Sequence, residues 1–138
     1  MKIRLVKQSP VAHKPINDLV EMYAKRLNRF TPTEKIVLKN KNKYKKNGFT
    51  ILLDPRGELL STDQLVEKIV SLQNYSSHKT IEFVIGDSYG FDDSDRKNAD
   101  FILSISNFTM AGDVAWLTLW EQIYRVFSVI EATPYHHE

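Results

Sequence analysis

The chain has 138 residues, of which 42% are hydrophobic and 26% charged, and this predicts a single globular domain over residues 1–138. Its formal net charge is only +2, and it has no cysteine, which excludes disulfides, thiolate nucleophiles and cysteine-ligated metal sites. The charged N-terminus lacks an apolar segment of signal-peptide length, and no apolar run is long enough to cross a bilayer. We therefore expect a cytoplasmic protein that is not bound to a membrane.

The first third of the chain predicts two strands around one helix. Residues 2–7 alternate between charged and apolar side chains, which indicates a strand. Pro15 suits the first turn of a helix, and the apolar residues after it recur at helical spacing until residues 31–32 end the helix. Residues 36–38 predict a short strand, and residues 39–48 form a polar loop without periodicity.

Three further strands are predicted where largely apolar runs end at turn residues, at 49–53, 81–85 and 101–103. Ser61 and Gln64 have the spacing of a capping box, which predicts a helix between the first two of these strands. A short helix is expected between the last two. This alternation predicts an α/β fold with a mostly parallel sheet and helices on both faces.

Residues 111–130 predict a long final helix that is apolar on nearly all sides. Such a helix must be buried on more than one side. Either it faces the core on one side and a second subunit on the other, which we favour and which predicts a homodimer, or it is sunk into its own domain. Glu121 and Arg125, on its narrow polar stripe, are spaced to pair across one turn.

Ligands of open parallel sheets bind beyond the carboxyl ends of the strands, and turn-forming residues follow three predicted strands at 54–57, 86–90 and 104–110. Glycines in the first two let the backbone approach a ligand closely, so these loops together could hold a flat heterocycle. Taken singly, each loop is better explained as an ordinary turn. Phosphate loops, the dinucleotide-binding glycine pattern and the hydrolase serine elbow are absent, so kinase, NAD-enzyme and hydrolase functions lose their usual support.

Two polar segments carry further candidate residues. One is a lysine-rich segment that either attracts phosphate or is simply a solvated loop. Its lysines are Lys35, Lys39, Lys41, Lys43, Lys45 and Lys46. The other is the tail, where Tyr135, His136 and His137 could stack on a base and move a proton, or could fray. No metal site is predicted, because adjacent histidines rarely reach one ion.

Seven motifs together resemble a known family over nearly the whole chain. They are Met1–Ile3, Glu21–Leu27, Leu53–Gly57 with Ser61, Phe83–Gly86 with Gly90, Leu103–Thr109, Glu121–Arg125 and Pro134–His136. This set resembles the RlmH family of SPOUT methyltransferases, which methylate N3 of a pseudouridine in large-subunit ribosomal RNA. The last two motifs together are specific to that family, whereas the glycine loops alone are not.

The resemblance implies a SPOUT fold with a C-terminal trefoil knot, a homodimer, and S-adenosylmethionine bound in the knot. The implied cofactor-binding residues are Leu53, Gly86, Ile105, Ser106, Asn107, Phe108, Thr109 and Met110. Tyr135 and His136 would reach the target nucleotide beside the partner subunit's cofactor, with His136 as the expected base and Tyr135 as a stacking or hydrogen-bonding group. The residues expected to contact phosphates of the ribosomal RNA, in the large subunit or the assembled ribosome, are Arg26, Lys41, Lys43, Lys45 and Lys46.

The chain also departs from the family pattern. Asp87 replaces the second glycine of a Gly-Gly pair, Ala111-Gly112 replaces Pro-His, and Trp116 replaces an arginine. A helical insert before the Leu-Asp loop is replaced by the short polar loop of residues 39–48, called the lysine-rich loop below. Because the lost histidine and arginine are candidate RNA-handling groups, three alternatives stay open: a different RNA target such as transfer RNA, an RNA-binding member without activity, and a dimeric scaffold without a ligand.

Overall fold

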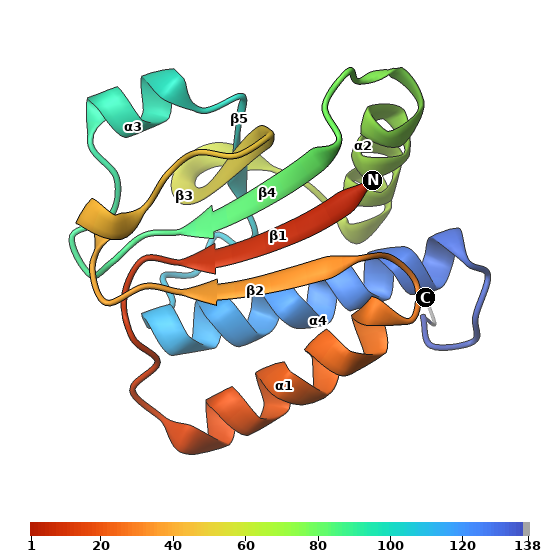
Figure 1. The fold of residues 1–138 in the computed structure, drawn as a ribbon, viewed down its shortest axis with the longest axis horizontal. Coiled ribbons are helices and arrows are strands. Elements are labelled where there is room, and N and C mark those ends of the chain that lie inside the picture. The colour runs from red at the N-terminus through yellow and green to blue at the C-terminus, as the bar shows by residue number, and fades with distance from the viewer. Residues whose placement is uncertain (137–138) are drawn as a thin grey trace.

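The computed structural model of the protein describes residues 1–136 (Figure 1). Five parallel strands form one sheet in the order β2-β1-β4-β3-β5. The strands are β1 (Lys2–Lys7), β2 (Thr33–Val37), β3 (Phe49–Leu59), β4 (Thr80–Ile85) and β5 (Phe101–Ser104). The helices are α1 (Lys14–Asn28), η1 (a 3-10 helix, Lys41–Lys43), α2 (Thr62–Tyr75), α3 (Asp93–Asn98) and α4 (Gly112–Ile130). The predicted α/β class with a parallel sheet is confirmed.

The two faces of the sheet are covered unequally. Alternate strand side chains such as Ile3, Leu5 and Phe83 pack into the main core with α1, α2 and α4. On the opposite face, Val6 and Val84 belong to a small second core, which is covered by α3 and its flanks and by the lysine-rich loop (Figure 1). No helix within residues 1–136 is long and apolar enough to cross a membrane.

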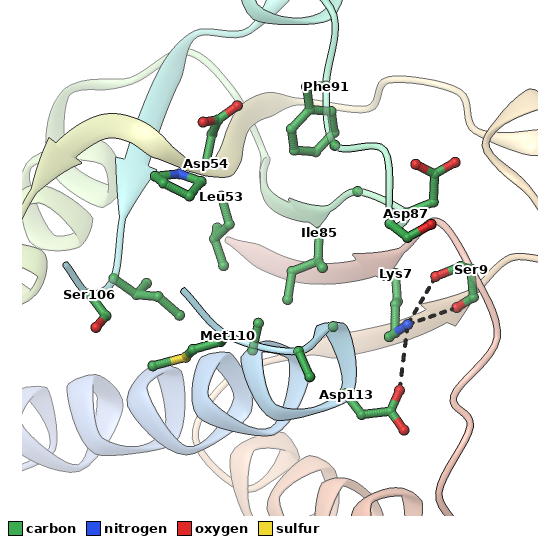
Figure 2. A pocket seen from close by; sticks show the side chains of 18 of the residues that line it. Lys7, Ser9, Leu53, Asp54, Ile85, Asp87, Phe91, Ser106, Met110 and Asp113 are labelled. Atoms are coloured by element: carbon green, nitrogen blue, oxygen red, sulfur yellow. Dashed lines mark hydrogen bonds and ion pairs between the residues drawn. The ribbon is translucent and has the colours of Figure 1, made fainter. Parts of the chain in front are cut away.

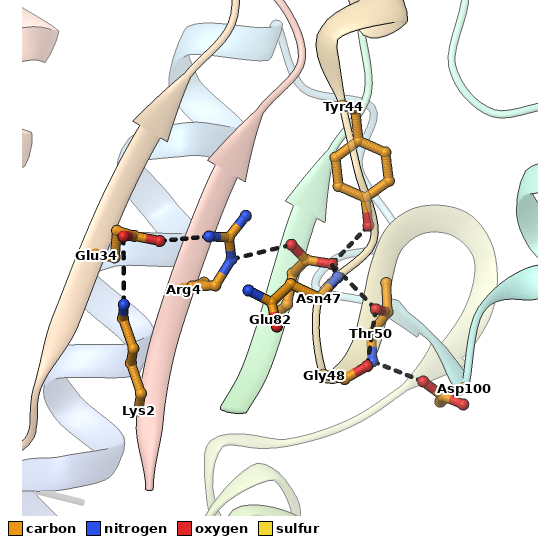
Figure 3. A network of polar contacts seen from close by, with 9 residues as sticks. All are labelled: Lys2, Arg4, Glu34, Tyr44, Asn47, Gly48, Thr50, Glu82 and Asp100. Atoms are coloured by element: carbon orange, nitrogen blue, oxygen red, sulfur yellow. Dashed lines mark hydrogen bonds and ion pairs between the residues drawn. The ribbon is translucent and has the colours of Figure 1, made fainter. Parts of the chain in front are cut away.

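A polar network on the second face anchors the lysine-rich loop to the sheet (Figure 3). The carboxylate of Glu82, on β4, is fully buried and accepts hydrogen bonds from Tyr44 Oη at 2.5 Å and Thr50 Oγ1 at 3.0 Å. It also accepts from Arg4 Nε at 3.3 Å and from the backbone N–H of Asn47 at 3.2 Å. A buried carboxylate is stable only when it is paired and hydrogen-bonded, and the loop supplies two of these donors. The loop is therefore part of the folded domain.

Most of the apolar surface of α4 is buried within its own chain, against the sheet, α1 and α2. Trp116 and Trp120 have no exposed surface, and their rings meet edge to face with centroids 5.6 Å apart. The alternative that this helix is sunk into its own domain therefore explains most of its composition. Two features of this region stay open to a partner subunit. Val114 is 46% exposed, and a hollow of about 250 Å³ is lined by residues of α1 and α4. The homodimer stays a prediction, as does the knotted path of the chain.

Local signals in the sequence are accurate for helix starts and less so for the end of β3. Ser61 and Gln64 form the predicted capping box of α2. Residues 54–57 do not simply end the strand: Leu103 of β5 pairs with Leu53 and again with Glu58, so the intervening residues bulge out and β3 then resumes. Pro55 has no N–H for the ladder, and the backbone of the bulge at Gly57 lies against the Ile102 carbonyl, which a Cβ would approach to 2.5 Å.

Candidate functional site

A cavity of about 450 Å³ opens at the carboxyl edge of the sheet (Figure 2). Residues at the carboxyl ends of β1, β4 and β5 and at the bulge of β3 form its walls, and the first turn of α4 closes one side. Its apolar lining includes Leu53, Ile85, Phe91, Leu103 and Met110. This size and largely apolar character are typical of small-molecule sites, and the position is the one expected for ligands of parallel sheets.

The three predicted loops converge on this cavity. Of the residues predicted to bind a cofactor, those that line it are Leu53, Gly86, Ile105, Ser106, Phe108 and Met110. Asn107 and Thr109 belong to the same segment but are not among the lining residues. The cofactor-binding role of all these residues stays a prediction.

Short-range hydrogen bonds fix the shape of two of these loops. Ser104 Oγ donates to the Ser106 carbonyl at 3.0 Å, and Ser106 Oγ accepts from the Phe108 N–H at 2.8 Å. Asp87 Oδ1 accepts from the Tyr89 N–H at 3.0 Å. Within residues 1–136, Asp87 Oδ2 has no protein partner, so a carboxylate oxygen of a lining residue is available to a ligand. Hydrogen bonds within the chain therefore contribute to the shape of both loops.

The sequence did not point to a group of ionisable residues on the opposite wall. Lys7 at the end of β1, His13 just before α1, and Asp113 in the first turn of α4 all line the cavity. The Asp113 carboxylate accepts from the backbone N–H groups of Ala12 and His13, each at 2.9 Å, and contacts His13 Nδ1 at 2.8 Å. Lys7 Nζ lies 3.7 Å from Asp113 Oδ1 and donates to Ser9 Oγ at 3.0 Å (Figure 2).

Burial and pairing shift the pKa values of Lys7 and Asp113. Burial lowers the pKa of Lys7, and the attraction of Asp113 opposes this only in part. Burial would raise the pKa of Asp113, but hydrogen bonds from His13 and Ala12 and the charge of Lys7 hold it below its ordinary value. Asp113 is therefore an anion at neutral pH. It is held in place by the backbone and imidazole donors of the segment before α1 and by the charge of Lys7 on β1.

The predicted catalytic residues Tyr135 and His136 lie at the other end of the molecule. α4 has 19 residues, so the tail is separated from the cavity by the length of that helix, about 28 Å. The tail packs back onto the helix: the rings of Tyr124 and Tyr135 meet with centroids 4.6 Å apart, and Arg125 Nη1 contacts His136 Nδ1 at 3.1 Å. The predicted Glu121–Arg125 pair is present at 3.1 Å. A single chain does not bring the tail to the cavity.

The tail cluster also determines the state of Tyr135. Burial and the neighbouring Tyr23 hydroxyl, at 3.5 Å, raise the pKa of Tyr135 to about 12. The phenol is therefore a neutral hydrogen-bonding group at physiological pH.

The predicted RNA-binding residues form two separate sets. Lys41, Lys43 and Lys45 are exposed on the lysine-rich loop, whereas Lys46 Nζ is already engaged by Asp100, at 3.1 Å, and by the Asn98 carbonyl. The guanidinium of Arg26 belongs to the tail cluster, about 6.0 Å from the centroid of the Tyr23 ring. These positions do not test RNA binding, which stays a prediction.

Comparisons with known proteins agree with the motifs. The family model described as "Predicted SPOUT methyltransferase" matches residues 1–136. The chain belongs to the SPOUT methyltransferase family. A ribosomal RNA large subunit methyltransferase H of Thermus thermophilus is 32% identical over 120 residues, which cover 85% of each chain. The protein of the same name from Caldicellulosiruptor bescii is 31% identical over 154 positions, covering 97% of this chain and 99% of that one.

The second of these alignments is longer than the 138 residues of this SPOUT chain, in accord with a segment that is shorter here than in that relative. A probable methylase family protein from Haemophilus influenzae has a similar structure, with a TM-score of 0.56 and 11% identity over 99% of this chain and 70% of that one. That likeness supports the fold alone. The resemblance to the RlmH family is thus confirmed at the level of the family.

The structure explains two of the departures from the family pattern. Trp116 is fully buried in the main core, so in this chain its position serves packing and does not contact a substrate. Gly112 is exposed beside the cavity, and the next residue, Asp113, binds the imidazole of His13. The chain therefore has a histidine at this wall of the cavity, although it comes from a different segment. No sequence signal indicated it, because residues 13 and 113 are distant along the chain.

Proposed function

We propose that this SPOUT protein transfers a methyl group from S-adenosylmethionine to a base of large-subunit ribosomal RNA, with N3 of a pseudouridine as the target. The carboxyl-edge cavity carries the proposal, because loops of the family pattern converge there from three strands. The relatives named above are themselves called ribosomal RNA large subunit methyltransferases. We further propose that the protein acts in the cytoplasm.

The residues of the cavity fit such a methyl donor. Its volume of about 450 Å³ lies within the usual ~300–1,000 Å³ of small-ligand sites. Leu53, Ile105 and Met110 offer apolar walls for a flat ring, and the free oxygen of Asp87 can accept from a hydroxyl or ammonium group. At Gly86 an added Cβ would lie 3.3 Å from the Phe91 ring, so the backbone there forms part of a close-fitting cradle.

When bound, the donor supplies a methyl group that is activated by an adjacent sulfonium. The chain then has to align the target nitrogen with that methyl, and such positioning accounts for much of the rate of a transfer reaction. The target nitrogen must also lose its proton. Tyr135 and His136 are proposed to hold the target nucleotide, with the neutral phenol of Tyr135 donating a hydrogen bond or stacking on the base.

This arrangement requires two copies of the chain. Because α4 separates the tail from the cavity of the same chain, we place the tail of one copy beside the cavity of the other in a homodimer. Leu19 is 43% exposed at the rim of the hollow between α1 and α4, which gives the partner an apolar surface to cover. The exposed lysines of the loop and Arg26 are proposed to contact RNA phosphates.

Transfer of a tritium label from S-adenosylmethionine to large subunits and assembled ribosomes that lack this methyl group tests the proposal. We expect label in large-subunit RNA, at one nucleotide per ribosome, located by nuclease digestion. Binding of the donor without transfer to these particles would contradict the proposed substrate. Label in transfer RNA instead would assign a different target.

A further inference from the structure

His13 and Asp113 form a hydrogen-bonded pair on the wall of the cavity. The distance from His13 Nδ1 to Asp113 Oδ2 is 2.8 Å, and the same oxygen accepts the His13 backbone N–H. The Asp113 side chain is only 8% exposed, whereas the His13 side chain is 73% exposed and lines the cavity. The pair therefore has a buried carboxylate behind an accessible imidazole.

The carboxylate determines which nitrogen of His13 carries the proton. An ionised carboxylate can only accept, so Nδ1 must donate to it. In the neutral imidazole, Nε2 then has a free lone pair. No protein atom within residues 1–136 hydrogen-bonds Nε2, and it is therefore available as a proton acceptor.

Lys7 adds its charge to the hydrogen bonds from His13 and Ala12 that hold Asp113 in the charged form. Its ammonium lies 3.7 Å from Asp113 Oδ1 and is itself held by the Ser9 hydroxyl and the Ser9 and Pro10 carbonyls. Lys7 and Asp113 are thus positioning residues. They join the end of β1, the segment before α1 and the start of α4, and so they fix the imidazole relative to the cavity.

The histidine of the tail has the opposite arrangement. Arg125 Nη1 lies 3.1 Å from His136 Nδ1, and a guanidinium can only donate. Nδ1 of His136 must therefore accept, which places the proton of the neutral ring on Nε2. The outward nitrogen of His136 is a hydrogen-bond donor, suited to holding a carbonyl oxygen of a base.

We propose that His13, oriented by Asp113, is the general base of the methyl transfer, and that His136 only binds the target nucleotide. This rests on the proposed function. The lone pair of the target nitrogen forms the new N–C bond, the S–C bond of the donor breaks with its electron pair going to sulfur, and the N–H proton passes to His13 Nε2. The sulfonium becomes a neutral thioether, and the imidazolium later releases its proton to water.

The substitution His13→Asn separates proton acceptance from structure. The asparagine amide can still donate to Asp113, and asparagine is a favoured residue before a helix, but it has no basic nitrogen. We expect kcat to fall about 100-fold or more, as for loss of a general base, with the KM for RNA and the affinity for S-adenosylmethionine unchanged. His136→Ala is expected to raise KM more than it lowers kcat. His78 is an exposed histidine whose ring meets Phe49 edge to face, and it is not among the residues that line the cavity. His78→Asn is therefore the matched control, with unchanged kinetics expected.

A second readout does not depend on activity. Nitrogen-15 NMR of the free protein should show that the neutral imidazole of His13 is protonated on Nδ1. The His13 signals are assigned by their disappearance in His13→Asn. In Asp113→Asn, we expect His13 to be a mixture of the two tautomers. A His13 protonated on Nε2, or full kcat in His13→Asn, would overturn the assignment. An inactive wild type with the expected tautomer would instead count against the proposed substrate, so the two failures are distinguishable.

Discussion

Lys7 Nζ lies 3.7 Å from Asp113 Oδ1, and this contact joins the carboxyl end of β1 to the first turn of α4 across the wall of the cavity. Both side chains are almost fully buried, at 3% and 8% exposure. Such a pair does not by itself indicate a stability gain, because removing two charges from water is costly. Its effect here is geometric, since Asp113 also binds the backbone of Ala12 and His13.

The charge of Asp113 should make stability depend on pH. Asp113→Asn is expected to lower the free energy of unfolding by about 2 kcal/mol near neutral pH, because hydrogen bonds to a charged group are lost. Since the folded-state pKa of Asp113 is depressed, the wild-type advantage is present above the unfolded-state pKa and disappears as pH falls through the folded-state value. Urea unfolding of both proteins at about pH 7 and about pH 2 measures this difference.

Asp18→Asn is the control for that experiment. Asp18 pairs with Lys14 on the exposed surface of α1, where ion pairs contribute under about 1 kcal/mol. If Asp113→Asn lowers the free energy of unfolding by the same amount at acidic as at neutral pH, its effect does not come from the charge of Asp113.

The lysine-rich loop should control the salt dependence of RNA binding. Replacing Lys41, Lys43 and Lys45 together by glutamine is expected to reduce the slope of log affinity against log salt by about 3, one unit for each lost phosphate contact. Lys46→Gln should change the slope less, because its ammonium is already paired with Asp100. Filter binding to ribosomal RNA at several salt concentrations measures both, and an unchanged slope in the triple variant would leave the loop as a solvated segment.

Leu19→Glu should separate the two halves of the proposed dimer. Leu19 is 43% exposed beside the hollow between α1 and α4, so the isolated chain tolerates the charge while an apolar interface does not. We expect a monomer by sedimentation, with donor binding retained and methyl transfer lost. Leu59→Glu, at a residue on β3 that is 48% exposed, is the matched control and should stay dimeric. A wild type that sediments as a monomer would exclude the partner's tail from the site.

Much of the fold could be predicted because the signals that define it are local. The capping box of Ser61 and Gln64 and the alternation within β1 depend on neighbouring residues only. The continuation of β3 beyond its bulge could not be predicted, because Glu58 pairs with Leu103 of a strand that comes much later in the chain. The burial of α4 was likewise ambiguous, since composition shows that a helix is covered but not by what.

Much of the site could also be predicted, because ligands of open parallel sheets bind beyond the carboxyl ends of the strands. This rule indicates three of the contributing segments, and the family motifs indicate residues on them. The end of β1 is not one of these three, although Lys7 is one of the lining residues. Its position at the carboxyl end of a strand in the same parallel sheet is the signal that could have identified it. The pairing of His13 with Asp113 had no sequence signal, because it arises only when the start of α4 folds against the start of α1.

Isothermal titration of the protein with S-adenosylmethionine tests the central claim, that the carboxyl-edge cavity binds the methyl donor, most directly. We predict one bound molecule per wild-type chain and at least about a tenfold weaker affinity, or ~1.4 kcal/mol, for Gly86→Val, because its side chain enters the space between the Phe91 ring and the loop. Thermal unfolding of the variant verifies that it folds. Absence of binding by the wild type, or equal affinity of a folded Gly86→Val, would contradict the claim.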